Sequence, residues 1–291
     1  MNKPVIAVGN IAVGGTGKTP FCLELIRLCL HHHLQPAIVS RGYGNDEKEI
    51  YIKRFPEIPM AFSPNRIQAC QELITQNPQI SCIILDDAYQ HQKIGRDLNI
   101  LLINSLEPFG YNYCLPRGFL RESPNSIKRA NLIILTHADE VNSHEKDQIK
   151  SKIKSYALEN TPLFEASHEP DYFLSPSGEK INIDQFEKKS FSKIAMLCGV
   201  AQPKGFLNTL FKLQISPLRS FIFADHYQYL SKDFEILSKE KNTFDCLITT
   251  EKDIVKIPDK IRIDLNIFTL VMRLKISDEE KLIAQITELI K

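Results

Sequence analysis

The chain has 291 residues, of which 43% are apolar and 24% charged, enough for one large or two ordinary globular domains. Its net charge of +1 gives no indication of nucleic acid or of a strongly acidic partner. Seven scattered cysteines without a C-x-x-C pair, no signal-peptide pattern and no apolar run of roughly 18 residues predict a reduced, cytoplasmic protein.

The first half of the chain alternates apolar strands with helices. Pro4–Val8 is a short β-branched run that predicts a buried strand, and a helix is expected from about Thr19. Further strands are expected at Ala37–Ser40, Cys82–Leu85, Ile100–Ile103 and Leu132–Leu135, with a helix at Asn65–Thr75. This alternation predicts an α/β fold with a mostly parallel sheet sandwiched by helices.

The second half predicts a smaller α/β domain. Ser143–Tyr156 reads as a charged helix, and Phe164–Phe186 carries turn residues that suggest a hairpin or linker. After it we expect strands at Ile194–Cys198, Ser220–Phe223, Cys246–Thr249 and Asn266–Leu270, and helices at Lys204–Leu213 and Asp278–Ile290. The expected division is therefore 1–160 and 161–291, joined by a β-hairpin-like linker, with the second domain closing a cleft.

A glycine-rich run between the first strand and the first helix predicts a phosphate-binding loop, or P-loop. It comprises Ala12, Val13, Gly14, Gly15, Thr16, Gly17, Lys18 and Thr19, and its backbone N–H groups would converge on the phosphates of ATP. Lys18 would reach the β- and γ-phosphates, and Thr19 would offer its hydroxyl to Mg²⁺. Ala12 stands where the strict motif has its first glycine.

Polar residues follow several of the other strands, at the edge where open α/β sheets bind ligands. Asp86 and Asp87 end an apolar strand and, with Thr19, are the candidate Mg²⁺ ligands. The other candidate site residues are Arg41 in Ser40–Gly44, Gln90 and His91 after the acidic pair, Arg121 and Glu122 in Leu115–Glu122, and Asp225 in Phe223–His226.

Together these motifs resemble the tetraacyldisaccharide 4′-kinases, the lipid A 4′-kinases of Gram-negative bacteria. The resemblance also rests on Val8–Asn10 and, in the second half, on Cys198–Pro203 and Thr249–Asp253. It implies a P-loop kinase of lipid A biosynthesis that uses ATP and Mg²⁺ to phosphorylate the 4′-hydroxyl of a tetraacylated glucosamine disaccharide 1-phosphate. It also implies two α/β domains with the site in the cleft.

The resemblance assigns catalytic roles to Lys18 and to two further residues. The family's catalytic aspartate falls on Asp46, in an expected loop, Gly44–Lys48, where Asn45-Asp46-Glu47-Lys48 replaces Gly-Asp-Glu-Pro. Its histidine partner falls on His226, and its phosphate and metal neighbours fall on Asp86, Asp87, Arg121 and Glu122. Asp46 and His226 would form a dyad in which one member accepts the proton of the attacking hydroxyl and the other orients it.

The implied substrate has acyl chains that lie in a bilayer. We therefore expect a cytoplasmic protein with peripheral contact to the inner membrane and no nucleic-acid partner. Family members usually carry an N-terminal segment with a membrane-docking helix before the P-loop strand, whereas this sequence starts at that strand, so we do not expect attachment through that helix.

Two alternative functions remain open from the residues. A P-loop ATP-dependent ligase or synthetase would begin with the same strand, loop and helix but deliver phosphate to a carboxylate. A nucleotide-switch protein is the other alternative, because Thr136–Asp139 faintly resembles a guanine-recognition turn, with His137 where lysine is expected. A comparison of GTP with ATP would separate these alternatives.

Overall fold

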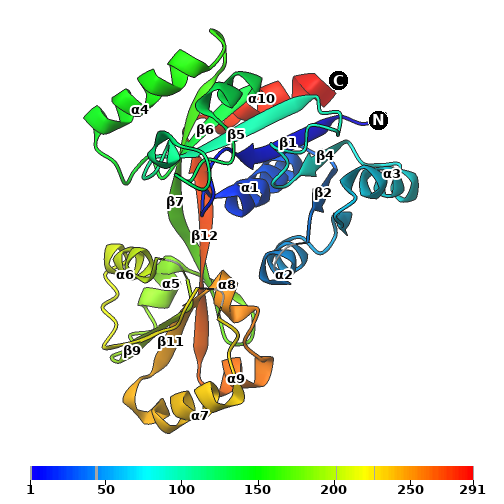
Figure 1. Cartoon of the computed structure of the whole chain (residues 1–291). Coiled ribbons are helices and arrows are strands. Elements are labelled where there is room, and N and C mark those ends of the chain that lie inside the picture. The colour runs from blue at the N-terminus through cyan, green and yellow to red at the C-terminus, as the bar shows by residue number, and fades with distance from the viewer. Residues whose placement is uncertain (1, 43–44, 201, 226, 291) are drawn as a thin grey trace. The chain divides into compact units, whose positions relative to one another are not determined.

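The computed structural model describes residues 2–42, 45–200, 202–225 and 227–290, with the side chains of 45–47 and 289–290 left aside. The chain forms two compact units (Figure 1). Unit 1 comprises Met1–Tyr43, Arg54–His168 and Leu274–Lys291, and unit 2 comprises Gly44–Lys53 and Glu169–Arg273. Strands β7 (Leu163–Leu174) and β12 (Ile267–Ile276) each run from one unit into the other, so the chain passes between the units along both.

Unit 1 is built on a parallel sheet in the order β7-β6-β5-β1-β4-β2-β3. Its other strands are β1 (Val5–Asn10), β2 (Pro36–Ser40), β3 (Met60–Phe62), β4 (Cys82–Leu85), β5 (Leu98–Asn104) and β6 (Leu132–Thr136). The central strands are buried along nearly their whole length, as their continuous apolar sequences predict. Because the strands are parallel, the loops after β1, β4, β5 and β6 meet at one edge of the sheet.

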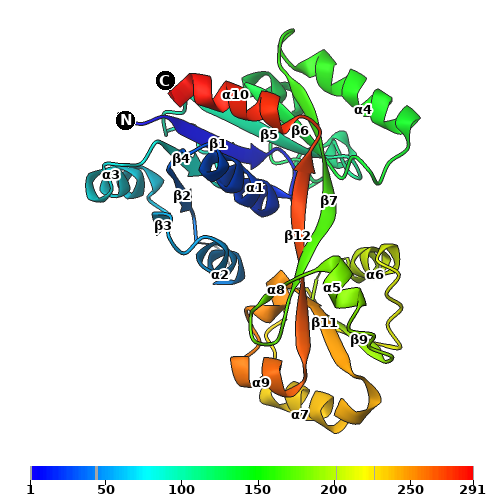
Figure 2. The same cartoon turned by 180° about the vertical axis from the view of Figure 1, so that it is seen from behind.

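Helices cover both faces of this sheet. On one face, Val5 and Ala7 share a core with α3 (Arg66–Gln76), and Ile133 shares a core with Ile153 of α4 (Ser143–Tyr156). On the other face lie α1 (Lys18–His31) and α10 (Glu279–Ile290), side by side in front of the strands in Figure 2. Arg27 of α1 donates a hydrogen bond to Glu279 of α10 at 2.8 Å.

Unit 2 has a second sheet in the order β10-β9-β11-β12-β7, with β8 antiparallel to β7. Its further strands are β8 (Lys180–Asn182), β9 (Ile194–Cys198), β10 (Arg219–Ile222) and β11 (Cys246–Thr250). Helices α5 (Ile183–Glu187) and α6 (Pro203–Lys212) share one apolar cluster with the sheet, and α7 (Ser231–Lys239), α8 (Glu251–Ile254) and α9 (Asp259–Asp264) share the other. Helix α2 (Asn45–Arg54) groups with this unit.

The expected α/β class with a mostly parallel sheet is confirmed, and β7 and β8 form the hairpin expected after residue 164. The units, however, do not follow the expected boundary at residue 160. Residues 274–291 belong to unit 1, where α10 is held against α1, and residues 44–53 cluster with unit 2. None of the described helices combines the length and apolar character needed to cross a bilayer.

Candidate active site

The P-loop turns into α1 through two glycines with left-handed backbone angles. Gly14 has φ +108°, and Gly17, the N-cap of the helix, has φ +78°. A residue with a side chain is strained in this region, although a Cβ at Gly17 would make only ordinary contacts, 3.5 Å from Thr136 and His168. The helix then begins at Lys18, so its unpaired N–H groups and partial positive charge face the turn.

Ala12 departs from the glycine-rich motif without disturbing this turn. The left-handed residues of the loop are Gly14 and Gly17, and Ala12 is not among them. Its methyl group is buried in the same apolar cluster as Tyr89 and Leu120. Alanine at this position therefore contributes to the core instead of straining the loop.

Thr16 is the anchor of the loop. Its hydroxyl accepts a hydrogen bond from the buried Asn10 side chain at 2.6 Å, and its carbonyl accepts one from the Thr136 hydroxyl at 3.2 Å. Asn10 ends β1 and Thr136 ends β6, so two buried strands hold the same residue. The loop is consequently in place before any phosphate binds.

The segment that carries Arg121 braces the loop from the other side. Val13 N donates to the carbonyl of Phe119 at 2.8 Å, and Arg121 N donates to the carbonyl of Ile11 at 2.7 Å. These are backbone contacts, so they orient the Arg121 side chain through the path of the chain itself. The position of the Arg121 backbone is therefore fixed by its hydrogen bond to Ile11, directly after β1, as well as by its own segment.

Asp87 lies at the centre of a charged cluster beside the loop. Its carboxylate accepts hydrogen bonds from Arg121 NH1 at 3.0 and 3.2 Å, and Lys18 Nζ is 3.6 Å from Oδ1. Burial alone would raise the pKa of this carboxyl, but the charges of Lys18 and Arg121 outweigh it and hold the pKa below its usual value. Asp87 also has φ +48°, and such backbone strain is often found at functional sites. Its neighbour Asp86 is only 2% exposed.

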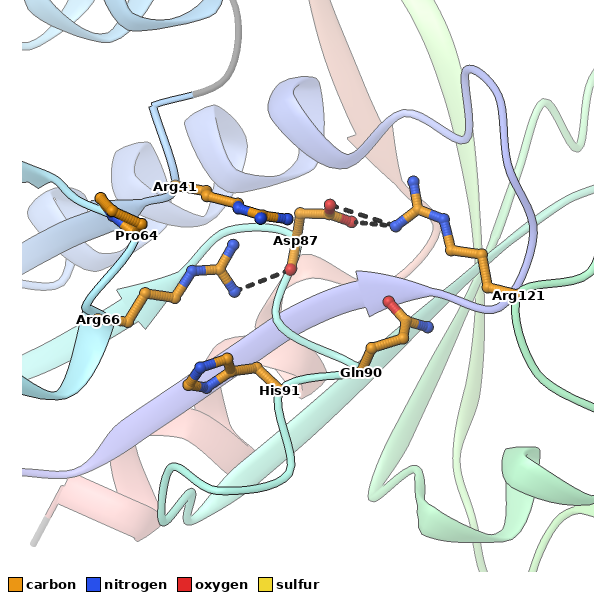
Figure 3. Close-up of a pocket in the computed structure, with 7 residues that line it drawn as sticks. All are labelled: Arg41, Pro64, Arg66, Asp87, Gln90, His91 and Arg121. Atoms are coloured by element: carbon orange, nitrogen blue, oxygen red, sulfur yellow. Dashed lines mark hydrogen bonds and ion pairs between the residues drawn. The ribbon is translucent and has the colours of Figure 1, made fainter.

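A cavity of about 390 Å³ opens beside this cluster (Figure 3). Its lining residues are Arg41, Pro64, Arg66, Asp87, Gln90, His91 and Arg121. Arg66, which is 4% exposed, donates from NH1 to the carbonyl of Asp87 at 2.9 Å. Three guanidinium groups around one carboxylate make the cavity strongly cationic, which suits an anionic ligand such as a phosphate.

Gln90 and Glu122 form a second hydrogen-bonded group next to the cavity. Gln90 Nε2 donates to the carbonyl of Asn10 at 2.6 Å and to Glu122 Oε1 at 3.1 Å. The other oxygen of Glu122 accepts a hydrogen bond from Arg129 at 2.7 Å. Glu122 thus fixes Gln90 and does not line the cavity, whereas its neighbour Arg121 does.

His91 presents a neutral imidazole to the cavity. Burial, together with the charges of Arg66 and Arg96, lowers the pKa of His91 below its ordinary value. Its Nδ1 is buried and has no hydrogen-bond partner among the described residues. The ring therefore keeps an unused hydrogen-bonding atom at the cavity wall, although this atom is not exposed to the cavity itself.

Thr19, Asp86 and Asp87 supply the oxygen donors that Mg²⁺ prefers. Thr19 and Asp86 are buried, and Asp87 is oriented by two cations. Within the described part of the chain, no group of three or more acidic, histidine or cysteine side chains could hold a metal ion by itself. The donor set therefore fits a metal ion that arrives with a nucleotide, whose phosphate oxygens and waters complete its shell.

Comparison with known proteins identifies the family. Residues 1–291 match the family model described as tetraacyldisaccharide-1-P 4′-kinase. The chain belongs to this family. The tetraacyldisaccharide 4′-kinase of Flavobacterium psychrophilum is 33% identical over 298 residues, covering 96% of this chain and 84% of that protein. The enzyme of the same name from Flavobacterium johnsoniae is 34% identical, covering 88% and 78%. The crystal structure of LpxK from Aquifex aeolicus in complex with ATP superposes with a TM-score of 0.74 at 25% identity, covering 100% of this chain and 90% of that one.

In this member of the 4′-kinase family, unit 1 brings together most of the predicted site residues. The P-loop, Arg41, the acidic pair, Gln90, His91 and Arg121 all lie at one edge of its sheet. Asp46 is in the first turn of helix α2 and not in a loop as expected, because the helix already begins at Asn45. The Asp46 side chain and the whole of His226 lie outside the described residues, and Asp225 is exposed after β10. The Asp46–His226 dyad stays a prediction.

Two residues in or beside the site were not predicted from the sequence. Arg66 was missed because it begins a helix, where a cation is ordinarily a solvated surface residue. Asn65 caps that helix by accepting a hydrogen bond from Gln68 N, and this cap turns the first residue toward Asp87. His168 was missed because it lies within a long strand, far in sequence from Gly17 of the P-loop, where an added Cβ would lie 3.5 Å from its ring.

The buried His168 should make the stability of the fold sensitive to acid. Burial first, and then the neighbouring His137, lower the pKa of His168 to about 4. Between roughly pH 6.5 and pH 4, His168 is protonated in the unfolded chain but stays neutral in the folded protein. The free energy of unfolding therefore decreases as the pH falls through this window, and it decreases no further through this residue below pH 4. The whole loss is about 3 kcal/mol at most. The melting temperature of His168→Gln should therefore fall less between pH 7 and pH 4.5 than the melting temperature of the unchanged protein. His144→Gln on α4 is the matched control, and identical pH slopes for all three proteins would contradict this role of His168.

Proposed function

We propose that the protein transfers the γ-phosphate of ATP to the 4′-hydroxyl of a tetraacyldisaccharide 1-phosphate. The observation that carries this proposal is the family match over residues 1–291, which includes the P-loop, the acidic pair and Arg121. The cationic cavity beside Lys18 supports it, because the transferred group and both phosphate-bearing substrates are anionic. The match favours a kinase over the ligase and nucleotide-switch alternatives.

Asp87 would hold the two key cations ready for the nucleotide. Without ATP, its carboxylate binds Arg121 and lies 3.6 Å from Lys18. The phosphates of ATP offer these cations a larger negative charge, so both would exchange the carboxylate for phosphate oxygens. The released Asp87, with Asp86 and Thr19, would then hold Mg²⁺, which supplies charge neutralisation at the phosphates when bound.

The transfer itself depends mainly on position and charge. The oxygen of the acceptor hydroxyl forms a bond to the γ-phosphorus while the bond to the bridging oxygen of ADP breaks, and ADP leaves with that electron pair. Lys18 and Arg121 stabilise the charge on the transferred group throughout. The hydroxyl proton passes to the predicted Asp46–His226 dyad, whose two members share the tasks of accepting and orienting.

The cavity beside Asp87 is our candidate for the acceptor sugar. Arg41 and Arg66 would face its anionic groups, and the neutral ring of His91 would form part of its wall. Gln90, fixed between Asn10 and Glu122, would define the wall next to the P-loop. With this assignment the acceptor would lie on the Asp87 side of Lys18, where the γ-phosphate is expected.

The direct test is incubation of purified protein with Mg²⁺, ATP and tetraacyldisaccharide 1-phosphate, followed by mass spectrometry of the lipid. We expect one added phosphate at the 4′ position and an equal amount of ADP. GTP in place of ATP, and a lipid with a blocked 4′-hydroxyl, are the controls. Nucleotide hydrolysis without lipid phosphorylation, with GTP preferred over ATP, would favour a nucleotide switch instead.

The acidic pair should control the dependence on Mg²⁺. We expect Asp86→Ala and Asp87→Ala to raise the Mg²⁺ concentration needed for half-maximal activity by about tenfold or more, because each removes a hard oxygen donor. Calorimetry should show the same loss in the Mg²⁺ dependence of ATP binding. Asp139→Ala, at the end of a different strand, is the matched control and should not change it. An unchanged Mg²⁺ requirement in both pair variants would contradict the metal assignment.

A further inference from the structure

Unit 1 exposes an apolar surface on one short segment. Residues 108–120, here called the aromatic loop, contain four large side chains that remain in solvent, namely Tyr111 (62% exposed), Leu115 (54%), Tyr113 (46%) and Phe119 (45%). Soluble proteins rarely leave several such groups together on one surface unless something binds there. The aromatic loop is therefore a candidate interaction site.

The aromatic loop has a defined conformation. The rings of Tyr111 and Phe119 are 5.3 Å apart, and Arg117 lies 3.7 Å above the ring of Tyr113. The chain approaches itself so closely that a Cβ at Gly118 would be 2.3 Å from the carbonyl of Tyr113. Hydrogen bonds from Val13 and to Ile11 tie the end of the segment to the P-loop strand. Its apolar side chains are thus presented on a built surface and not on a loose tail.

The charged residues within and over the aromatic loop are cations. Residues 108–120 contain no aspartate or glutamate, and Arg117 is their charged residue. Lys152 of α4 adds a second cation, 4.2 Å from the ring of Phe109 and hydrogen-bonded to Asn112. The carboxylate nearest in sequence, Glu107, accepts a hydrogen bond from Tyr111 N at 3.3 Å. Tyrosines, leucine and cations together suit the boundary between lipid headgroups and acyl chains.

We propose that the aromatic loop docks on the surface of an anionic phospholipid bilayer. Tyr111, Tyr113 and Leu115 would enter the headgroup region, while Arg117 and Lys152 would pair with lipid phosphates. The purpose of this contact rests on the proposed function: the loop continues into Arg121 and is hydrogen-bonded to the P-loop at Val13, so docking would bring the phosphate site to an acceptor whose acyl chains stay in the membrane.

Cys114 allows a direct test, because it is exposed while the other six cysteines are buried. It can be labelled with a polarity-sensitive thiol dye in the otherwise unchanged full chain. Vesicles of phosphatidylethanolamine and phosphatidylglycerol should shift the emission of the dye to the blue, and purely phosphatidylcholine vesicles should shift it less. An unchanged emission in the presence of bound vesicles would overturn the proposal, since the protein would then bind through another surface.

Variants test the same surface without a label. Tyr111→Ser with Leu115→Ser should weaken co-sedimentation with the anionic vesicles by about tenfold, because binding scales with the apolar area inserted. The matched control is Leu218→Ser with Ile263→Ser, which removes two equally exposed apolar side chains from unit 2 and should leave sedimentation unchanged. Equal loss in both double variants, or none in the first with melting temperatures unchanged, would contradict the assignment.

These measurements need neither ATP nor the lipid substrate, so they can fail independently of the proposed kinase activity. If the activity fails but the dye still shifts, the docking surface stands and the function does not. If the dye shifts with protein concentration alone, a second copy of the chain covers the loop, and the bilayer proposal is overturned. The first double variant should also keep its activity on substrate dispersed in detergent, where docking is not required.

Discussion

Lys18→Ala is expected to lower the turnover number for phosphoryl transfer by at least about 10³-fold while the protein stays folded. The ammonium group follows the phosphate charge into the transition state, where it is worth more than in the bound ATP complex. The fold should tolerate its loss, because Asp87, the carboxylate nearest Lys18, keeps the hydrogen bonds from Arg121 and so does not become an unpaired buried charge. The measurement is the turnover number at saturating ATP and lipid, together with the melting temperature.

Lys18→Arg is an informative companion to this variant. It keeps the positive charge but replaces a compact ammonium by a larger planar fork with a different hydrogen-bonding geometry. We expect it to remain far below the unchanged protein and above Lys18→Ala. A turnover number of Lys18→Ala within about threefold of the unchanged protein would remove the charge argument and with it the P-loop assignment.

Asp46→Ala and His226→Ala are each expected to lower turnover by about 10²–10⁴-fold, because a positioned acid–base group contributes that much to proton transfer. If the two residues share one proton-transfer task, the double variant should be little worse than either single variant. The KM for ATP should stay nearly constant, because neither residue belongs to the phosphate cradle. The measurement is a double-mutant cycle in turnover number, with ATP binding measured separately.

The cycle has two outcomes that would revise the dyad. Losses that multiply in the double variant would mean that the two residues act independently. An Asp46→Ala variant with full activity would mean that another residue accepts the proton, and His91, a neutral imidazole that lines the cavity, would be the next candidate. His91→Gln would then be the variant to measure.

The elements of the fold could be predicted where local signals are strong. Strand Cys82–Leu85 and the helix expected at about Ser143–Tyr156 match the structure, because one is a continuous apolar run and the other is a charged run without strand pattern. In the structure Asn142 caps this helix in a capping box with Glu145. Strand β3 and helix α2 were missed, since β3 is short and half-buried and the polar helix α2 has no clear apolar face. Local sequence does not carry the contacts that stabilise such elements.

The motifs of the site could be predicted from the sequence, but the contacts between their side chains could not. The P-loop and the acidic pair have sequence motifs because their chemistry requires particular residues at particular spacings. The pairing of Asp87 with Lys18 and Arg121, and the burial of Arg66 in the same cavity, join residues from four separate segments. No spacing encodes such contacts. The two compact units differ from the expected division at residue 160 for the same reason, because the return of the last helix to unit 1 leaves no mark in the local pattern.

The placement of α10 has a consequence for how the protein acquires its structure during synthesis. Unit 1 contains the P-loop, which emerges early from the ribosome, but α1 receives its partner helix only when residues 274–291 have been made. A nascent chain that has released only its first half would leave apolar surface of α1 uncovered in water. Unit 1 can therefore complete its fold only after the C-terminal residues have been made. Fragments that stop near residue 160 should be poor material for studying the phosphate site.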